Sequence, residues 1–203
     1  MSALKIIKRR LLKQKCVITI NLFFQSITDS DGTRQVDKIN KIVSAQRFFQ
    51  LPTFVETGTY MATTLISVHK HFETSYSIEL NHEFAQEAQH HFRNQKNVTI
   101  VEGDSGNSLE QILSTNTTKK LFWLDAHYSG GMTAQSADFG HTPISKELER
   151  IMLTWVEGSV ILIDDARLFI GEDNYPTIAD LTDYIQNQTK LTLFVDADII
   201  HIY

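Results

Sequence analysis

Short apolar runs alternate with helical segments from residue 53 onward, and this alternation constrains the fold more than any other feature. Most of the runs have apolar residues on successive positions, which is typical of strands covered by helices on both faces. The segments at 82–93 and 145–155 have helical spacing. The alternation predicts a doubly wound, mostly parallel α/β sheet. The expected strands cover residues 53–56, 75–79, 98–101, 121–124, 160–163, 191–195 and 199–202.

The last two expected strands are separated only by residues 196–198, which is too short for a helical crossover. We therefore expect these strands to form an antiparallel hairpin. Five parallel strands, a helix and a terminal hairpin resemble the class I methyltransferase fold. That fold is Rossmann-like, with seven strands, helices on both faces and an antiparallel last strand. The fold of a dinucleotide-binding dehydrogenase would not lead us to expect this hairpin.

Composition bounds the class of protein. The 203 residues suffice for one α/β domain with a short extension, and the net charge of −5 argues against a nucleic-acid binder. Residues 1–15 hold six basic side chains, no acid and an apolar helical stripe. We expect residues 1–52 to form a basic helical extension packed on a methyltransferase domain at 53–203. The single Cys16 excludes an internal disulfide, no stretch is long enough to span a membrane, and we expect a cytoplasmic protein.

The first strand runs into the turn Glu56-Thr57-Gly58-Thr59, which is followed by a helix near residue 63. Glycine lets the backbone turn tightly and approach a ligand, and ligands of such sheets bind beyond the carboxyl ends of the strands. The turn lacks the full G-x-G-x-x-G pattern, which disfavours a pyrophosphate. A cofactor with a carboxylate fits better.

Two further acids end the next strands. Glu79 follows Gly58 by 21 residues, where an acid hydrogen-bonds a ribose diol, and Asp104 follows the third strand. The segments ETGT, SIEL and EGDS look like the first three motifs of class I methyltransferases. This resemblance implies S-adenosylmethionine as the cofactor. It implies that Glu56, Gly58 and Thr59 lie near the methionine part of the cofactor. It also implies that Glu79 contacts the ribose and that Asp104 and Ser105 lie near the adenine.

Three aspartates follow the fourth and fifth strands. Asp125 ends the fourth, and Asp164 with Asp165 ends the fifth. Neighbouring strands lie about 5 Å apart, so we expect these carboxylates to converge. Carboxylates so close repel one another and need a counter-charge. A hard divalent cation, Mg²⁺ or Mn²⁺, supplies it through oxygen ligands.

This constellation resembles the metal-dependent sugar O-methyltransferases of the macrocin type. The resemblance implies Asp125, Asp164 and Asp165 as metal ligands. The family's general base is an Asp two residues beyond the first ligand, and here that position is His127, a departure that suits proton abstraction near neutral pH. The long segment from 129 to 143 contains glycines and is interpreted as facing the substrate, with Tyr128 and His141 as sugar contacts.

The sequence thus predicts a metal-assisted O-methyltransferase acting on a hydroxyl of a sugar or glycan. Two alternatives stay open: a non-catalytic methyltransferase-like binding subunit, and an O-methyltransferase for a small phenolic acceptor. The assembly also stays open between a homodimer and one domain of a longer glycan-building protein. A dehydrogenase is disfavoured by the incomplete glycine pattern, and a phosphohydrolase by the lack of an Asp two residues after Asp125.

Overall fold

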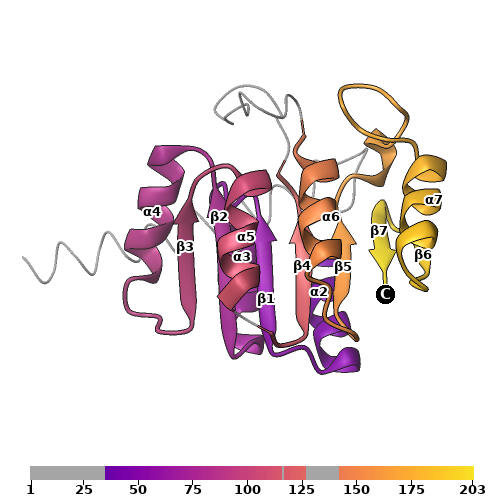
Figure 1. Cartoon of the computed structure of the whole chain (residues 1–203). Coiled ribbons are helices and arrows are strands. Elements are labelled where there is room, and N and C mark those ends of the chain that lie inside the picture. The colour runs from indigo at the N-terminus through magenta and orange to yellow at the C-terminus, as the bar shows by residue number, and fades with distance from the viewer. Residues whose placement is uncertain (1–34, 116, 127–141) are drawn as a thin grey trace, which may run out of the picture.

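The computed structural model describes residues 35–115, 117–126 and 142–203. The expected helix at 1–15 and three predicted site residues, His127, Tyr128 and His141, lie outside these residues. The described chain forms one seven-stranded sheet in the order β3-β2-β1-β4-β5-β7-β6 (Figure 1). The strands are β1 (Thr53–Thr57), β2 (Thr74–Glu79), β3 (Val98–Glu102), β4 (Lys120–Leu124), β5 (Val160–Ile163), β6 (Leu193–Asp196) and β7 (Ile199–Ile202).

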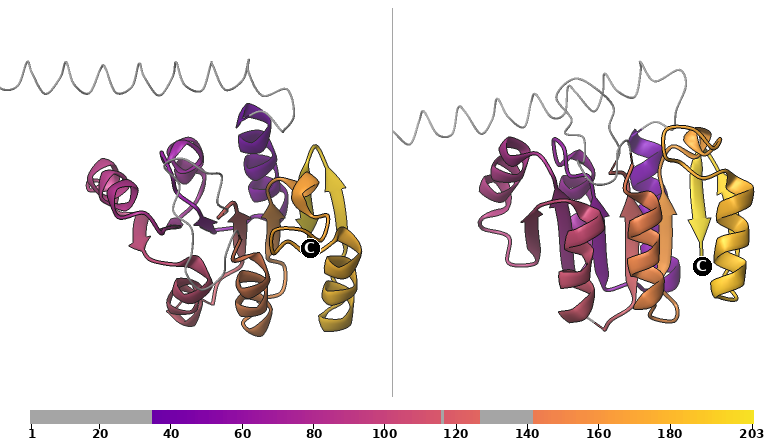
Figure 2. Two further views of the ribbon diagram at one scale, coloured as in Figure 1. Left: turned by 90° about the horizontal axis from the view of Figure 1, so that it is seen from above. Right: turned by 45° about the horizontal axis from the view of Figure 1, so that its top comes forward.

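Helices cover both faces of the sheet. Viewed from above, α2, α3 and α4 lie on one face and α5, α6 and α7 on the other (Figure 2). Two short 3-10 turns, η1 and η2, follow α3 and β5. The helical bounds are α2 (Gln35–Phe49), α3 (Thr63–Val68), η1 (His69–His71), α4 (His82–Phe92), α5 (Ser105–Thr115), α6 (Ile144–Leu153), η2 (Ala166–Leu168) and α7 (Ile178–Gln188).

The predicted pairing of the strands is confirmed. Strands β3, β2, β1, β4 and β5 are parallel neighbours, while β7 pairs antiparallel with both β5 and β6. Strand β6 begins two residues later than predicted, although Thr192 still exchanges backbone hydrogen bonds with Tyr203. Ala197 and Asp198 in the hairpin turn have positive φ, as the tightest hairpin turns require.

Alternating side chains of the central strands point to opposite faces of the sheet and belong to two apolar clusters, one on each face. Phe54 of β1 belongs to the cluster under α2, α3 and α4, and its neighbour Val55 belongs to the cluster under α5, α6 and α7. Both are fully buried. Strands sandwiched in this way become apolar on successive positions, which explains the sequence pattern. The order of strands reverses between β1 and β4, so the topological switch point of the sheet lies there.

Helix α2 packs on α3, β4 and β5. Its Ile42 and the following Leu51 are fully buried in the cluster on that face, and Gln35 donates a 2.9 Å hydrogen bond to Thr64 Oγ1 at the start of α3. Residues 35–52 of the expected extension therefore lie directly against the sheet. Across the described segments, no helix combines the length and the hydrophobicity that a membrane span needs.

Candidate functional site

The turn after β1 is held against the end of β4. Gly58 has a φ of +81°, and a Cβ built on it would lie 2.6 Å from the carbonyl oxygen of Asp125. The backbone N–H of Asp125 in turn donates to the carbonyl of Thr57 at 3.1 Å. No other residue type fits this close approach without a shift of the backbone. The turn predicted to hold the cofactor therefore adjoins the first of the three aspartates.

Glu56 lies beneath this turn and is 1 % exposed. Ser77 Oγ of β2 donates to its carboxylate at 2.5 Å, and Thr59 Oγ1 is hydrogen-bonded to the same Ser77 at 2.6 Å. Burial raises the pKa of Glu56 to about 8, against the opposing effect of the Ser77 hydrogen bond; the charges of Asp125 and Glu79 raise it further. Through Ser77, the buried Glu56 is linked to Thr59 of the turn.

Glu79 joins the ends of β1 and β2. Its two carboxylate oxygens accept from the backbone N–H groups of Tyr60, at 2.7 Å, and Asn81, at 2.8 Å. Each oxygen keeps acceptor capacity for a further donor, because a carboxylate offers about four lone-pair sites. Tyr60 and Ala62, on either side of Met61, both have positive φ, an uncommon conformation for such residues. Glu79 thus fixes the shape of the turn while facing the same edge of the sheet.

Asp104 and Ser105 lie where β3 passes into α5, and they lie near Glu147, a residue that the sequence analysis missed. Glu147 projects from α6, is 1 % exposed and is hydrogen-bonded to Ser105 and Thr57. Burial raises its pKa to about 7, against these two hydrogen bonds. Its position was readable, because Glu147 interrupts the apolar stripe of α6 that the other buried residues form: Ile144, Leu148 and Ile151.

Asp125, Asp164 and Asp165 lie together at the carboxyl ends of β4 and β5. One carboxylate oxygen from each lies within 4.8 Å of the others. Asp164 and Asp165 are buried. Burial first, and then the charge of Asp125, raise the pKa of Asp164 to about 8, although Lys38 opposes the shift. Two oxygens on opposite sides of a shared Mg²⁺ or Ca²⁺ would be about 4–5 Å apart, so the three carboxylates fit a hard divalent cation.

The chain also supplies counter-charges of its own. Lys38 of α2, with a side chain 16 % exposed, forms an ion pair with Asp164 Oδ2. Arg167 Nη1 lies 2.8 Å from Asp165 Oδ1 and also pairs with Asp198 of the hairpin turn. Burial lowers the pKa of Lys38, but the charges of Asp164, Asp125 and Asp165 outweigh it and the net shift is upward. Charge balance alone therefore does not require a metal at this cluster.

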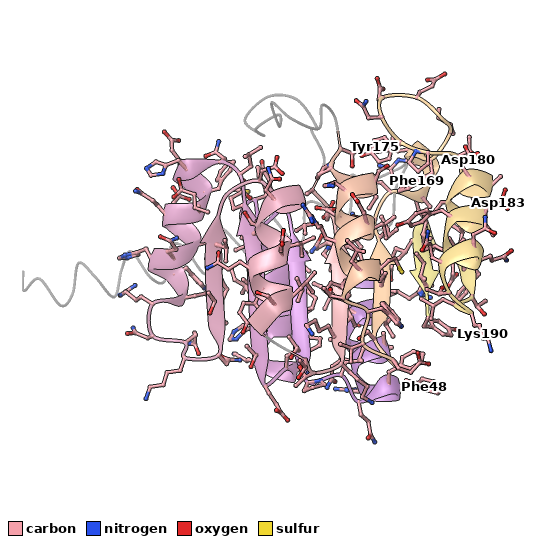
Figure 3. All side chains as sticks on the ribbon, viewed as in Figure 1. Phe48, Phe169, Tyr175, Asp180, Asp183 and Lys190 are labelled. Carbon is pink, nitrogen blue, oxygen red and sulfur yellow. The ribbon has the colours of Figure 1, made fainter. Side chains whose placement is uncertain are left out.

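An aromatic pair adjoins the cluster. The rings of Phe169 and Tyr175 meet edge to face with centroids 5.1 Å apart, and both lie near the carboxyl end of β5 (Figure 3). Tyr175 is hydrogen-bonded to Thr142. Burial is the main reason why the pKa of Tyr175 is raised, and the negative charges of Asp165 and Asp125 raise it further. The sequence analysis did not select either aromatic residue, because both lie in the irregular segment between β5 and α7.

The strand order, with its one antiparallel strand inserted beside β5, defines a Rossmann-like class I methyltransferase fold. No protein-family model and no curated protein matches the sequence. Among solved structures, the O-methyltransferase from Bacillus cereus in complex with SAH is similar at 13 % identity and a TM-score of 0.63, covering 91 % of this chain and 87 % of that one.

Two further structures have the same fold. The O-methyltransferase TomG from Streptomyces achromogenes, involved in tomaymycin synthesis and solved with SAM, shows 14 % identity and a TM-score of 0.60, over 86 % of this chain and 81 % of that one. The SAH-bound methyltransferase PaMTH1 from Podospora anserina shows 14 % identity and a TM-score of 0.61, over 91 % and 86 %. At this identity the likeness establishes the fold.

Proposed function

We propose that this protein is an S-adenosylmethionine-dependent O-methyltransferase. The observation that carries the proposal is the close approach of the Gly58 turn to Asp125, 2.6 Å from a built Cβ to the carbonyl oxygen. In a class I methyltransferase fold this approach joins the turn expected to hold the methyl donor to the carboxylates expected to hold the acceptor. The two halves of the reaction then meet at the switch point between β1 and β4.

The cofactor lies, in this proposal, along the carboxyl edge from β4 to β3. Glu79 accepts hydrogen bonds from the ribose hydroxyls, and Asp104 and Ser105 lie near the adenine. The methionine part lies over Gly58 and Thr59, with Glu56 beneath. The proposal is supported by the burial of Glu56, Glu79 and Ser105 and by their placement on three adjacent strand ends.

Asp125, Asp164 and Asp165 are the proposed ligands of a divalent cation, Mg²⁺ or Mn²⁺. When bound, such a cation lowers the pKa of an acceptor hydroxyl and orients its oxygen. His127, two residues beyond Asp125, is the proposed general base that removes the hydroxyl proton. The carboxylates and the turn fix the acceptor and the donor at one place, and holding reactants in line removes much of the entropic barrier.

The proposed acceptor is a sugar or glycan hydroxyl, as in the macrocin type, with Tyr128 and His141 as contacts. Tyr175 is partly buried near Asp165, with the buried Phe169 packed against it, and an aromatic ring suits the apolar face of a pyranose. A small phenol would suit the ring of Tyr175 as well, and product analysis distinguishes the two acceptor classes.

The test combines binding and turnover. Calorimetry should show S-adenosylmethionine binding with and without chelator, because the proposed cofactor residues do not include the three aspartates. Incubation with methyl-labelled cofactor and matched panels of glycosides and phenols should then label glycosides. Label on phenols alone would reassign the acceptor. Cofactor binding without transfer to any acceptor would instead identify a non-catalytic binding subunit, and absence of binding would contradict the proposal.

A further inference from the structure

Lys38 supplies a positive charge to the carboxylate cluster. Its ammonium group pairs with Oδ2 of Asp164, and Oδ1 of the same residue accepts the backbone N–H of Asp165 at 2.9 Å. Both oxygens of Asp164 are therefore engaged within the chain. A divalent cation that binds Oδ2 competes with Lys38 directly, and one that uses the remaining lone pair of Oδ1 binds the same carboxylate as the Lys38 ammonium group.

The position of Lys38 is set by the docking of α2. Ile42 follows Lys38 by four residues, on the same side of the helix, and is fully buried against the sheet. The helix packs on both β4 and β5, whose ends carry the three aspartates. The packing of α2 on the sheet thus places Lys38 beside the cluster, and the Lys38 side chain is itself largely buried.

We propose that a divalent cation binds the Asp125–Asp164–Asp165 cluster only in exchange for the Lys38 ammonium group. This inference rests on the metal role in the proposed function. Two positive charges on one buried carboxylate repel each other strongly, whichever of its oxygens each one contacts. Binding of the cation therefore requires the Lys38 side chain to leave Asp164, and Lys38 lowers the apparent affinity of the cluster for metal.

Lys41 provides a matched control. It lies on the same helix, three residues further along, and pairs with Asp196 on the exposed surface of β6. Substitution of either lysine by methionine removes one positive charge from α2 and keeps a long apolar side chain. Only the change at Lys38 removes a charge from the cluster itself.

The experiment measures Mn²⁺ affinity of metal-depleted protein by electron paramagnetic resonance of the free ion. Lys38→Met should bind Mn²⁺ about tenfold more tightly or better than wild type, because a competing charge is gone. Lys41→Met and the charge-conserving Lys38→Arg should stay within about twofold of wild type, since neither changes the charge at the cluster. Equal or weaker Mn²⁺ binding by Lys38→Met would overturn the inference.

A second measurement uses the wild type and covers the case in which Lys38→Met does not fold. An amine-acetylating reagent followed by mass spectrometry should label Lys38 more rapidly with saturating Mn²⁺ than without, while labelling of Lys41 stays constant. Unchanged labelling of Lys38 on Mn²⁺ binding would overturn the exchange. Absence of Mn²⁺ binding to every variant would overturn both the exchange and the metal role, while calorimetry with S-adenosylmethionine in chelator reports separately on the cofactor role.

Discussion

Buried carboxyl groups surround the proposed cofactor position, and two of them, Glu56 and Glu147, have a raised pKa through burial. The pKa of each of these two groups lies near neutral pH, whereas an exposed glutamate has a pKa of about 4.3. The hydroxyls of Ser77, Ser105 and Thr57 favour the ionised carboxylates and offset only part of the effect of burial. Individual side chains at this edge therefore make the stability of the fold depend on pH.

Glu147→Gln tests this dependence. The folded pKa of Glu147 is about 7, above the ordinary value of 4.5, so its stabilising contribution is complete below pH 4.5 and is lost as the pH rises toward 7. Glutamine imitates the protonated form at every pH. Urea denaturation should show the variant gaining about 1–3 kcal/mol relative to wild type between pH 5 and pH 8. A difference that does not vary with pH would show that Glu147 is ionised in the folded protein.

Glu79→Ala tests the ribose contact. Removal of the carboxylate should weaken S-adenosylmethionine binding by about 1–3 kcal/mol, the usual cost of losing charge-assisted hydrogen bonds, as measured by calorimetry. Glu102→Ala is the control, because Glu102 is the register partner of Glu79 at the end of β3 but is exposed and pairs with His82. Equal affinity of the two variants would remove Glu79 from the binding site.

The candidate site residues selected from the sequence lie mainly at the ends of parallel strands, because topology alone brings such positions to one edge. Glu79, Asp104 and Asp125 belong to this group. Lys38 was not predictable, since 126 residues separate it from Asp164 and only the docking of α2 brings the two together. Arg167, by contrast, lies two residues after Asp165 in the segment Asp-Asp-Ala-Arg, where a local ion pair could have been anticipated.

At the scale of elements, the turn between β1 and α3 is the most constrained segment of the site. Its glycine is in the left-handed region, and its backbone lies against that of Asp125. The turn also receives support from Glu79 through the N–H of Tyr60. A change in this element should therefore affect the fold and the cofactor together.

Gly58→Ala should destabilise the protein by more than the roughly 1–2 kcal/mol that left-handed backbone costs a non-glycine residue. Gly158→Ala is the matched control: Gly158 has nearly the same φ, +80°, but a Cβ there meets only the flexible side chain of Lys119. Thermal denaturation should give Gly58→Ala the lower midpoint, and only that variant should lose S-adenosylmethionine affinity. Equal midpoints would mean that the turn can move away from Asp125.

At the scale of the whole molecule, the alternation of strands and helices predicted the sheet, its mostly parallel pairing and the terminal hairpin. These features follow from burial on two faces and from the length of connections, which the sequence records directly. The sequence analysis did not single out helix α2 within the predicted extension, although Ile39, Ile42, Val43 and Phe49 dock it on the sheet. Its role depends on tertiary packing alone.

Metal removal tests the cluster in the intact protein. Exhaustive chelation should abolish transfer to an accepted sugar, and Mg²⁺ or Mn²⁺ should restore it. A cation at a hundred times its Kd should raise the free energy of unfolding by about 2.7 kcal/mol, observed as a higher melting midpoint. Full turnover after chelation would contradict the metal role of the three aspartates.

The pairing of β1 with β4, the joint between the two halves of the sheet, has a consequence for the order of folding. These strands are neighbours in register from Thr53 with Lys120 onward, yet β2 and β3 come between them along the chain. Closing so long a loop is slow, so the two halves of the sheet meet late. A cofactor that spans the joint can bind only after that step, and it must leave before the halves separate. Saturation with cofactor should accordingly lengthen the lifetime of the native state.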